Sequence, residues 1–123
     1  MQSTKRPTKT QAIRLRRSLH WKAVGAACAE SVEELYDITQ AELWSARKYE
    51  EVAFCRQCIY YTLHRELGLT STLVGKLLGK NHGTITYGAE RIAGFLDVDP
   101  ELRKDIKALV ALIKAKVGKA ANL

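Results

Sequence analysis

Five polar side chains capable of hydrogen-bonded recognition lie within residues 81–87: Asn81, His82, Thr84, Thr86 and Tyr87. An amide, an imidazole and hydroxyl groups donate and accept hydrogen bonds without breaking covalent bonds. Groups of these kinds pair with the exposed edges of nucleic-acid bases. The segment therefore indicates recognition chemistry. A rigid scaffold must hold these side chains in fixed orientations.

The surrounding sequence predicts that scaffold as two short helices joined by a tight turn. A first helix carries Val74, Leu77 and Leu78 and ends at Gly79. Lys80 and Asn81 cross the turn, with Asn81 as the N-cap of a second helix that begins at His82. The apolar stripe of this second helix consists of Ile85, Ala89, Ile92 and Leu96. This stripe faces the core, which leaves the polar residues and Gly83 facing outward.

The pattern has two interpretations. In DNA-binding helix-turn-helix domains the first residues of the second helix meet base edges in the major groove. The alternative is an αα-hairpin inside a small helical bundle, which carries no chemistry by itself.

A resemblance favours DNA binding. Residues 78–85 (LGKNHGTI) resemble the signature of the C-terminal DNA-binding domain, domain IV, of the DnaA replication-initiator family. Residues 32–43 (VEELYDITQAEL) resemble the first helix of that domain and its turn into a short second helix. Residues 52–67 (VAFCRQCIYYTLHREL) are similar to its long central helix, and Arg47-Lys48 resembles its basic loop. The match extends from about residue 28 to about residue 115.

The resemblance also implies functions for individual residues. Asn81, His82 and Thr84 would read bases or adjacent phosphates in the major groove. Arg47 or Lys48 would enter the neighbouring minor groove, where negative potential favours arginine. The remaining DNA-binding candidates are phosphate-holding Arg56 and Lys80, together with Thr72, Gly83, Thr86 and Tyr87.

Three departures from the family pattern bear on sequence preference. Asn81 stands where the family usually has Asp, and Gly83 stands where it usually has Thr or Ser. The turn before Lys80 is about one residue shorter. Gly83 lacks a methyl group that could contact thymine, although it lets the backbone approach DNA more closely.

The rest of the chain predicts an all-α fold, and the resemblance implies a small helical bundle of the DnaA domain IV and Trp-repressor-like type. Apolar residues recur at helical spacing along residues 52–67, and Asp99-Pro100 starts a last helix with an apolar face that continues until Gly118. The expected organisation is a basic arm at 1–27 that becomes helical after about Thr10, a DNA-binding domain at 28–117 and a tail at 118–123.

Charge is concentrated at the start of the chain. The 20 basic and 13 acidic residues give a net charge of +7. Residues 1–22 hold seven basic residues and no acidic one, so the remainder carries equal numbers of each sign. The arm could supply phosphate contacts or bind a protein partner, or it could be a solvated tail.

Other chemistries have little support in the sequence. Cys55 and Cys58 form a Cys-x-x-Cys in the middle of a helix, which favours buried, reduced cysteines over a metal or redox site. Gly75-Lys76 and Gly79-Lys80 lack the spacing of a phosphate loop, so we expect no nucleotide, metal or other cofactor. His20, His64 and His82 lack catalytic partners at diagnostic spacing, so an enzyme is disfavoured.

The sequence therefore predicts a stand-alone, sequence-specific double-stranded DNA-binding protein without an ATPase, acting in replication initiation or its regulation. No apolar segment resembles a signal peptide or a membrane span, so we expect a cytoplasmic location. A helical adaptor that docks on replication or transcription machinery is one alternative. Another is a dimeric Trp-repressor-like regulator, whereas the leading interpretation expects a monomer or weak dimer.

Overall fold

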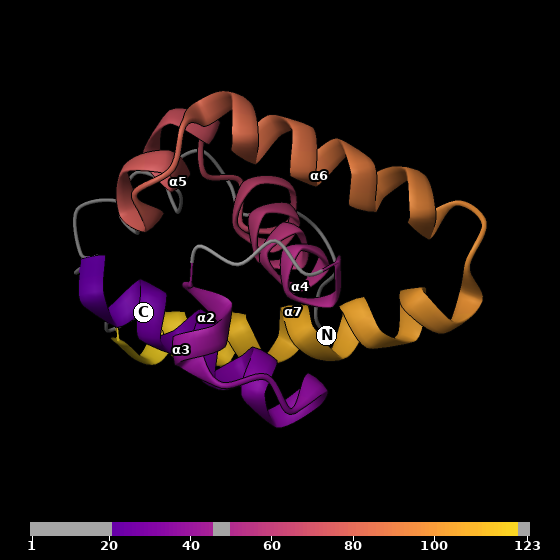
Figure 1. Ribbon diagram of the computed structural model, residues 1–123, viewed down its shortest axis with the longest axis horizontal. Coiled ribbons are helices and arrows are strands. Elements are labelled where there is room, and N and C mark those ends of the chain that lie inside the picture. The colour runs from indigo at the N-terminus through magenta and orange to yellow at the C-terminus, as the bar shows by residue number, and fades with distance from the viewer. Residues whose placement is uncertain (1–20, 46–49, 121–123) are drawn as a thin grey trace.

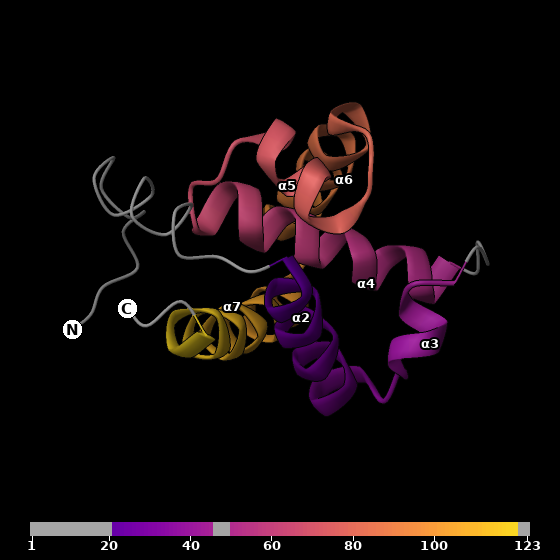
Figure 2. The same cartoon turned by 90° about the vertical axis from the view of Figure 1, so that its left-hand side faces the viewer.

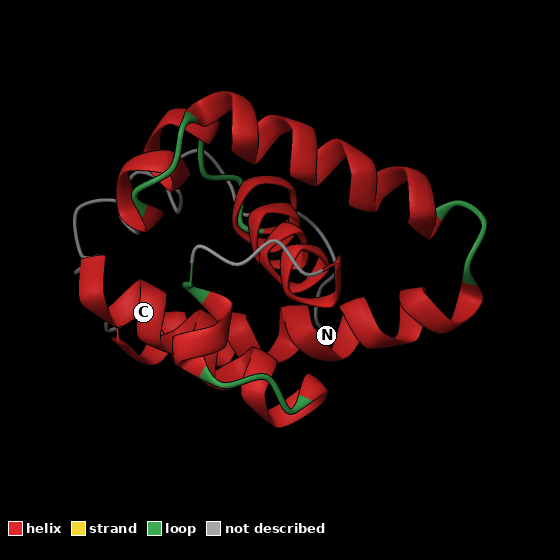
Figure 3. Ribbon diagram, in the orientation of Figure 1, coloured by secondary structure: helices red, strands yellow, loops and turns green. Residues whose placement is uncertain are grey.

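The computed structural model describes residues 21–45 and 50–120, of which 21–22 and 117–120 are described by their backbone alone. Within these ranges the chain is helical and contains no strand (Figure 3). The elements in order are α2 (Trp21–Tyr36), α3 (Gln40–Leu43), α4 (Glu50–Tyr61), a π-helical turn η1 (Thr62–Glu66), α5 (Ser71–Leu78), α6 (His82–Leu96) and α7 (Pro100–Ala120). The predicted all-α bundle with a helix-turn-helix is confirmed.

The bundle is organised around α4. Figure 1 shows α6 on one side of α4, with α2 and α7 on the other. The core is continuous across these helices and includes Val32 of α2, Ile59 of α4, Ile92 of α6 and Leu109 of α7. The two faces of α4 therefore hold the helix-turn-helix on one side and a supporting helix pair on the other (Figure 2).

The supporting pair is α2 and α7. Lys116 of α7 forms ion pairs with Glu30 at 3.5 Å and Glu34 at 3.0 Å, both on α2. Val24 and Ala27 are buried in the common core, so α2 contributes to the bundle before residue 28. The expected arm at 1–20 lies outside the described residues, and the domain limits remain a prediction.

The predicted central helix is present from Glu50 to Glu66, but its last turn is π-helical. Its predicted apolar positions are buried: Val52, Cys55, Ile59, Leu63 and Leu67. The hydroxyl of Thr62 donates to the carbonyl of Cys58 at 2.9 Å, and the N–H of Leu67 donates to the carbonyl of Thr62 at 2.9 Å. The five-residue spacing of the second bond widens the turn.

The last helix begins as predicted, because the side chain of Asp99 accepts a hydrogen bond from the N–H of Leu102 at 3.1 Å. Leu102, Ile106, Leu109 and Ile113 are buried along one face. The predicted end of the helix at Gly118 is wrong, because α7 continues to Ala120. A glycine costs about 1 kcal/mol inside a helix but does not terminate it alone. No helix in the described part of the chain is both long enough and apolar enough to span a bilayer.

Candidate nucleic-acid interface

The turn between α5 and α6 has the geometry that the sequence predicts. Gly79 ends α5 with φ 68°, the left-handed conformation that favours glycine. The N–H of Lys80 donates to the carbonyl of Gly75 at 2.8 Å, which folds the chain back against α5. The side chain of Thr70 caps the start of α5 by accepting from the N–H of Leu73 at 3.1 Å.

Gly75 of α5 contacts the turn, and sequence reasoning missed this role. A Cβ at this position would lie 2.5 Å from the backbone oxygen of Lys80, closer than real Cβ atoms approach. The close approach of α5 to the turn therefore requires glycine here. A glycine inside an otherwise amphipathic helix was the available signal, since such residues usually have a packing reason.

Asn81 is the N-cap of α6, as predicted. Its Oδ1 accepts a hydrogen bond from the N–H of Gly83 at 2.7 Å. Asn81, His82, Gly83 and Thr84 are all exposed, whereas the buried side of the helix begins at Ile85. The structure thus brings four of the predicted DNA-binding residues together at one helix end.

The outward surface continues along the first turns of α6. Tyr87 is 65% exposed, which is unusual for a large aromatic side chain. Thr86 is half-buried, and its hydroxyl donates to the carbonyl of His82 at 3.1 Å. Tyr87 is therefore available to an approaching partner, whereas the hydroxyl proton of Thr86 is already engaged in the bond to His82.

The charge of this region suits an anionic partner. Between Leu67 and Glu90 the sequence contains Lys76 and Lys80 but no acidic residue. Lys76 and Thr72 of α5 are exposed, and Lys80 is half-buried. The N-terminus of a helix also carries partial positive charge from unpaired N–H groups. Duplex DNA would therefore meet no carboxylate on the turn or on the first two turns of α6.

The position of α6 is fixed by contacts with α4. A Cβ at Gly88 would lie 2.8 Å from Cδ2 of Tyr60, so glycine allows the two helices to cross closely. Arg91 of α6 donates to Oε1 of Gln57 at 3.0 Å and forms a 4.0 Å ion pair with Glu50. These positioning residues were not identified from the sequence, because their importance arises only where the helices cross.

Arg56 also lies on α4, but its guanidinium is turned toward α3. It is half-buried and donates to the backbone carbonyls of Leu43 and Ser45. These bonds hold the end of α3 against α4, immediately before residues 46–49. The predicted minor-groove residues Arg47 and Lys48 lie in that segment, outside the described residues.

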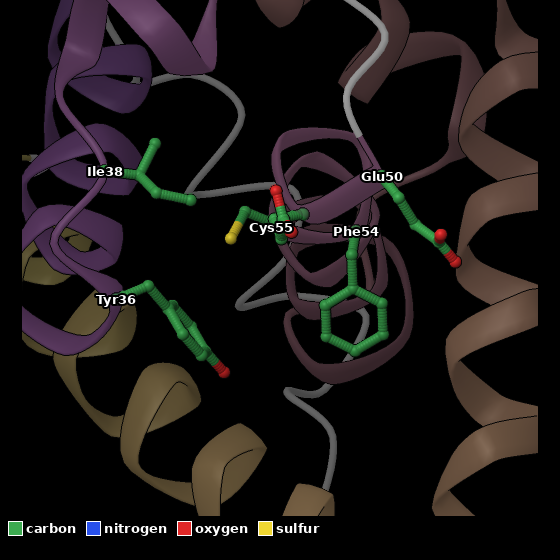
Figure 4. Close-up of a pocket in the computed structure, with 6 residues that line it drawn as sticks. Tyr36, Ile38, Glu50, Phe54 and Cys55 are labelled. Carbon is green, nitrogen blue, oxygen red and sulfur yellow. The ribbon is translucent and has the colours of Figure 1, made fainter.

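A separate hollow of about 400 Å³ lies between the end of α2 and the start of α4 (Figure 4). Its lining residues are Tyr36, Ile38, Glu50, Glu51, Phe54 and Cys55. The hydroxyl of Tyr36 is buried and has no hydrogen-bond partner among the described residues. Burial raises the pKa of the Tyr36 hydroxyl, so this group is protonated at neutral pH.

The cysteines are free and buried. Burial raises the pKa of Cys28 to about 12 and the pKa of Cys55 to about 11. Burial also raises the pKa of Cys58. These thiols are therefore protonated at neutral pH, and the thiolate is the nucleophilic form. No group of three or more potential metal ligands was found in the described ranges.

Comparisons with known proteins match this interface region. A family model described as the bacterial dnaA protein helix-turn-helix matches residues 27–92. The chromosomal replication initiator protein DnaA of Chloroflexus aggregans is 32% identical over 93 residues, which cover 75% of this chain and 20% of that relative. DnaA of Thermomicrobium roseum is 32% identical over 62% of this chain and 17% of its own length. For DnaA of Rickettsia akari the identity is 33%, with coverage of 69% and 19%. The chain therefore spans about a fifth of the length of these relatives.

Proposed function

Because the chain belongs to the bacterial DnaA helix-turn-helix family, a DNA-binding family, we propose that it binds double-stranded DNA sequence-specifically through the N-terminal end of α6. The supporting observation is the exposed cluster of small and polar residues formed by Asn81, His82, Gly83 and Thr84. It lies on a capped helix end, within residues 68–89, which contain no acidic residue. Small and polar side chains at this end of a recognition helix fit the major groove.

The proposed contacts are of two kinds. His82, Thr84 and Asn81 face the base edges, and Tyr87 extends the contact surface by one turn. Thr72 at the exposed start of α5 and Lys80 in the turn would contact phosphates, and such contacts position α6 without carrying sequence information. Gly83 would let the backbone of α6 approach the DNA closely. Thr86 would have a secondary role, because its hydroxyl already donates to the carbonyl of His82.

The other contacts that we propose lie toward α3. Arg47 or Lys48 would reach the adjacent minor groove. Arg56 would hold a phosphate, as its charge and its place next to residues 46–49 suggest. Its bonds to the two carbonyls would also position the segment that contains the minor-groove residues.

We also propose the biological setting. The relatives are named as chromosomal replication initiator proteins, which supports a role for this chain in replication initiation or its regulation. We expect the 123-residue chain to bind DNA by itself, without nucleotide, as a monomer or weak dimer in the cytoplasm. The basic arm at 1–27 would add phosphate contacts or bind a protein partner, beside a binding domain at 28–117 and a tail at 118–123.

The proposal is tested by removing one positive charge at a time. Lys80→Ala should lower the affinity for duplex DNA and reduce the slope of log K against log salt by about 1, because one phosphate contact disappears. Lys107→Ala removes the same charge from an exposed position of α7 and should leave the slope unchanged. Helix α7 and helix α6 lie on opposite sides of α4 (Figure 1). Equal slopes for Lys80→Ala, Lys107→Ala and the unaltered chain would contradict the proposed interface.

A further inference from the structure

The two polar atoms of the Asn81 side chain have different surroundings. Its Oδ1 is held by the N–H of Gly83 at 2.7 Å, a short hydrogen bond at the start of α6. Its Nδ2 has no hydrogen-bond partner among the described residues, and the residue is exposed. Because the oxygen is fixed on the helix end, the free edge of the amide is the NH₂ group with two donors.

Gly83 helps to hold this arrangement. A Cβ at residue 83 would lie 3.0 Å from Oδ1 of Asn81, which is tighter than most real Cβ contacts. Any larger residue would therefore push the capping oxygen away by a few tenths of an ångström. Glycine allows the oxygen to stay close to the N–H, which keeps the acceptor of Asn81 engaged.

We infer that Asn81 reads DNA as a donor and selects guanine at one position of the target site. This inference rests on the proposed function, because it assumes that α6 enters the major groove. An asparagine with both amide atoms free normally pairs with adenine, whose edge offers one donor and one acceptor. The bond from the N–H of Gly83 takes one lone pair of Oδ1 and turns the oxygen toward the helix end, which disfavours that bidentate pairing. Guanine instead offers two acceptors, O6 and N7, which match the two N–H donors.

The test exchanges the chemistry of residue 81 and keeps its capping function. Asn, Asp and Ser are about equally good N-caps. Asn81→Asp keeps an oxygen for the N–H of Gly83 and replaces the NH₂ donor by an acceptor. Asn81→Ser also keeps a capping oxygen and has no amide to reach a base. Unchanged melting temperatures would establish that all three chains are folded.

The readout is selection of duplexes from a random pool, followed by anisotropy titrations with the four base pairs at each selected position. The unaltered chain should prefer guanine at one position by about tenfold, the effect of one good base contact. Asn81→Asp should prefer cytosine at that position, because the amino group of cytosine can donate to the carboxylate. Asn81→Ser should lose the preference at that position and keep the rest of the motif.

The comparison uses ratios of affinity between base pairs, because the negative charge of Asn81→Asp weakens binding to every duplex. If all three chains select the same base at every position, Asn81 is a cap or a phosphate contact and the inference is overturned. A preference for adenine that depends on Asn81 would also overturn it, since that pairing needs Oδ1 to accept a hydrogen bond from the base. If the unaltered chain binds no duplex, both the proposed function and this inference fail.

Discussion

The backbone oxygen of Lys80 lies 2.5 Å from the point that a Cβ on Gly75 would occupy, and the N–H of Lys80 donates to the carbonyl of Gly75 at 2.8 Å. The first residue of the turn is thus pressed against α5 by a contact that only glycine permits. This contact fixes where α6 begins. The proposed DNA-binding surface depends on it, although Gly75 is buried and cannot touch DNA.

Gly75→Ala should therefore destabilise the protein by about 1–3 kcal/mol, the usual effect of inserting a methyl group where there is no space. Gly94→Ala is the matched control, because Gly94 is exposed in α6 and a Cβ there would meet nothing within 4 Å. That change should be neutral or stabilising by up to about 1 kcal/mol, since alanine favours helix. Urea unfolding of both variants measures the difference, and similar stabilities would show that the turn adapts to a side chain.

His82→Ala should weaken binding to a selected target by roughly 1–3 kcal/mol and leave binding to a scrambled duplex almost unchanged. The imidazole is exposed at the start of α6, so its removal should not affect the melting temperature. The measurement is the ratio of Kd values for the two duplexes. A parallel loss of affinity for both would assign His82 to phosphate binding.

Arg56 is expected to behave differently. Arg56→Ala should lower affinity for selected and scrambled duplexes alike, and it should also lower the melting temperature because the carbonyls of Leu43 and Ser45 lose their donors. Arg56→Lys keeps the charge but cannot reproduce both bonds of the planar guanidinium. Arg56→Lys should therefore recover only part of the affinity that Arg56→Ala loses. Full recovery would show that Arg56 only contacts a phosphate and does not position the neighbouring segment.

The buried cysteines predict an alkaline limit to stability. Burial raises the pKa of Cys28 from 9.0 to about 12 and that of Cys55 from 9.0 to about 11. Above pH 9 the unfolded thiols lose protons that the folded thiols retain. Stability is therefore full below pH 9 and should fall at higher pH by about 1.4 kcal/mol per pH unit for each such cysteine. Cys28→Ala should make the decline shallower between pH 9 and 11 in unfolding experiments, and an unchanged decline would contradict the assignment to Cys28.

Local signals predicted most of the helix-turn-helix. Gly79 and Asn81 act through the backbone conformation and the single N–H group next to them, so their residue types were sufficient to locate the end of α5 and the start of α6. The apolar spacing of residues 52–67 likewise located α4, because helical periodicity is a property of the segment itself.

The missed features depend on contacts between segments. Gly88 and the Gln57–Arg91 hydrogen bond matter because α4 and α6 cross closely, and no local pattern specifies that crossing. The orientation of Arg56 toward α3 has the same origin. A local signal can also mislead. Gly118 favours the end of a helix, but α7 continues past it, because one glycine is only a weak stop signal.

The most direct test of DNA binding is fluorescence anisotropy of the purified chain with labelled duplex DNA across a salt series. We expect binding at low salt and a linear fall of log K with log salt, because each phosphate contact releases counterions. A selected target should also bind more tightly than a scrambled duplex at every salt concentration. An absence of binding at low salt would contradict the proposed DNA-binding function and favour a helical adaptor that docks on other proteins.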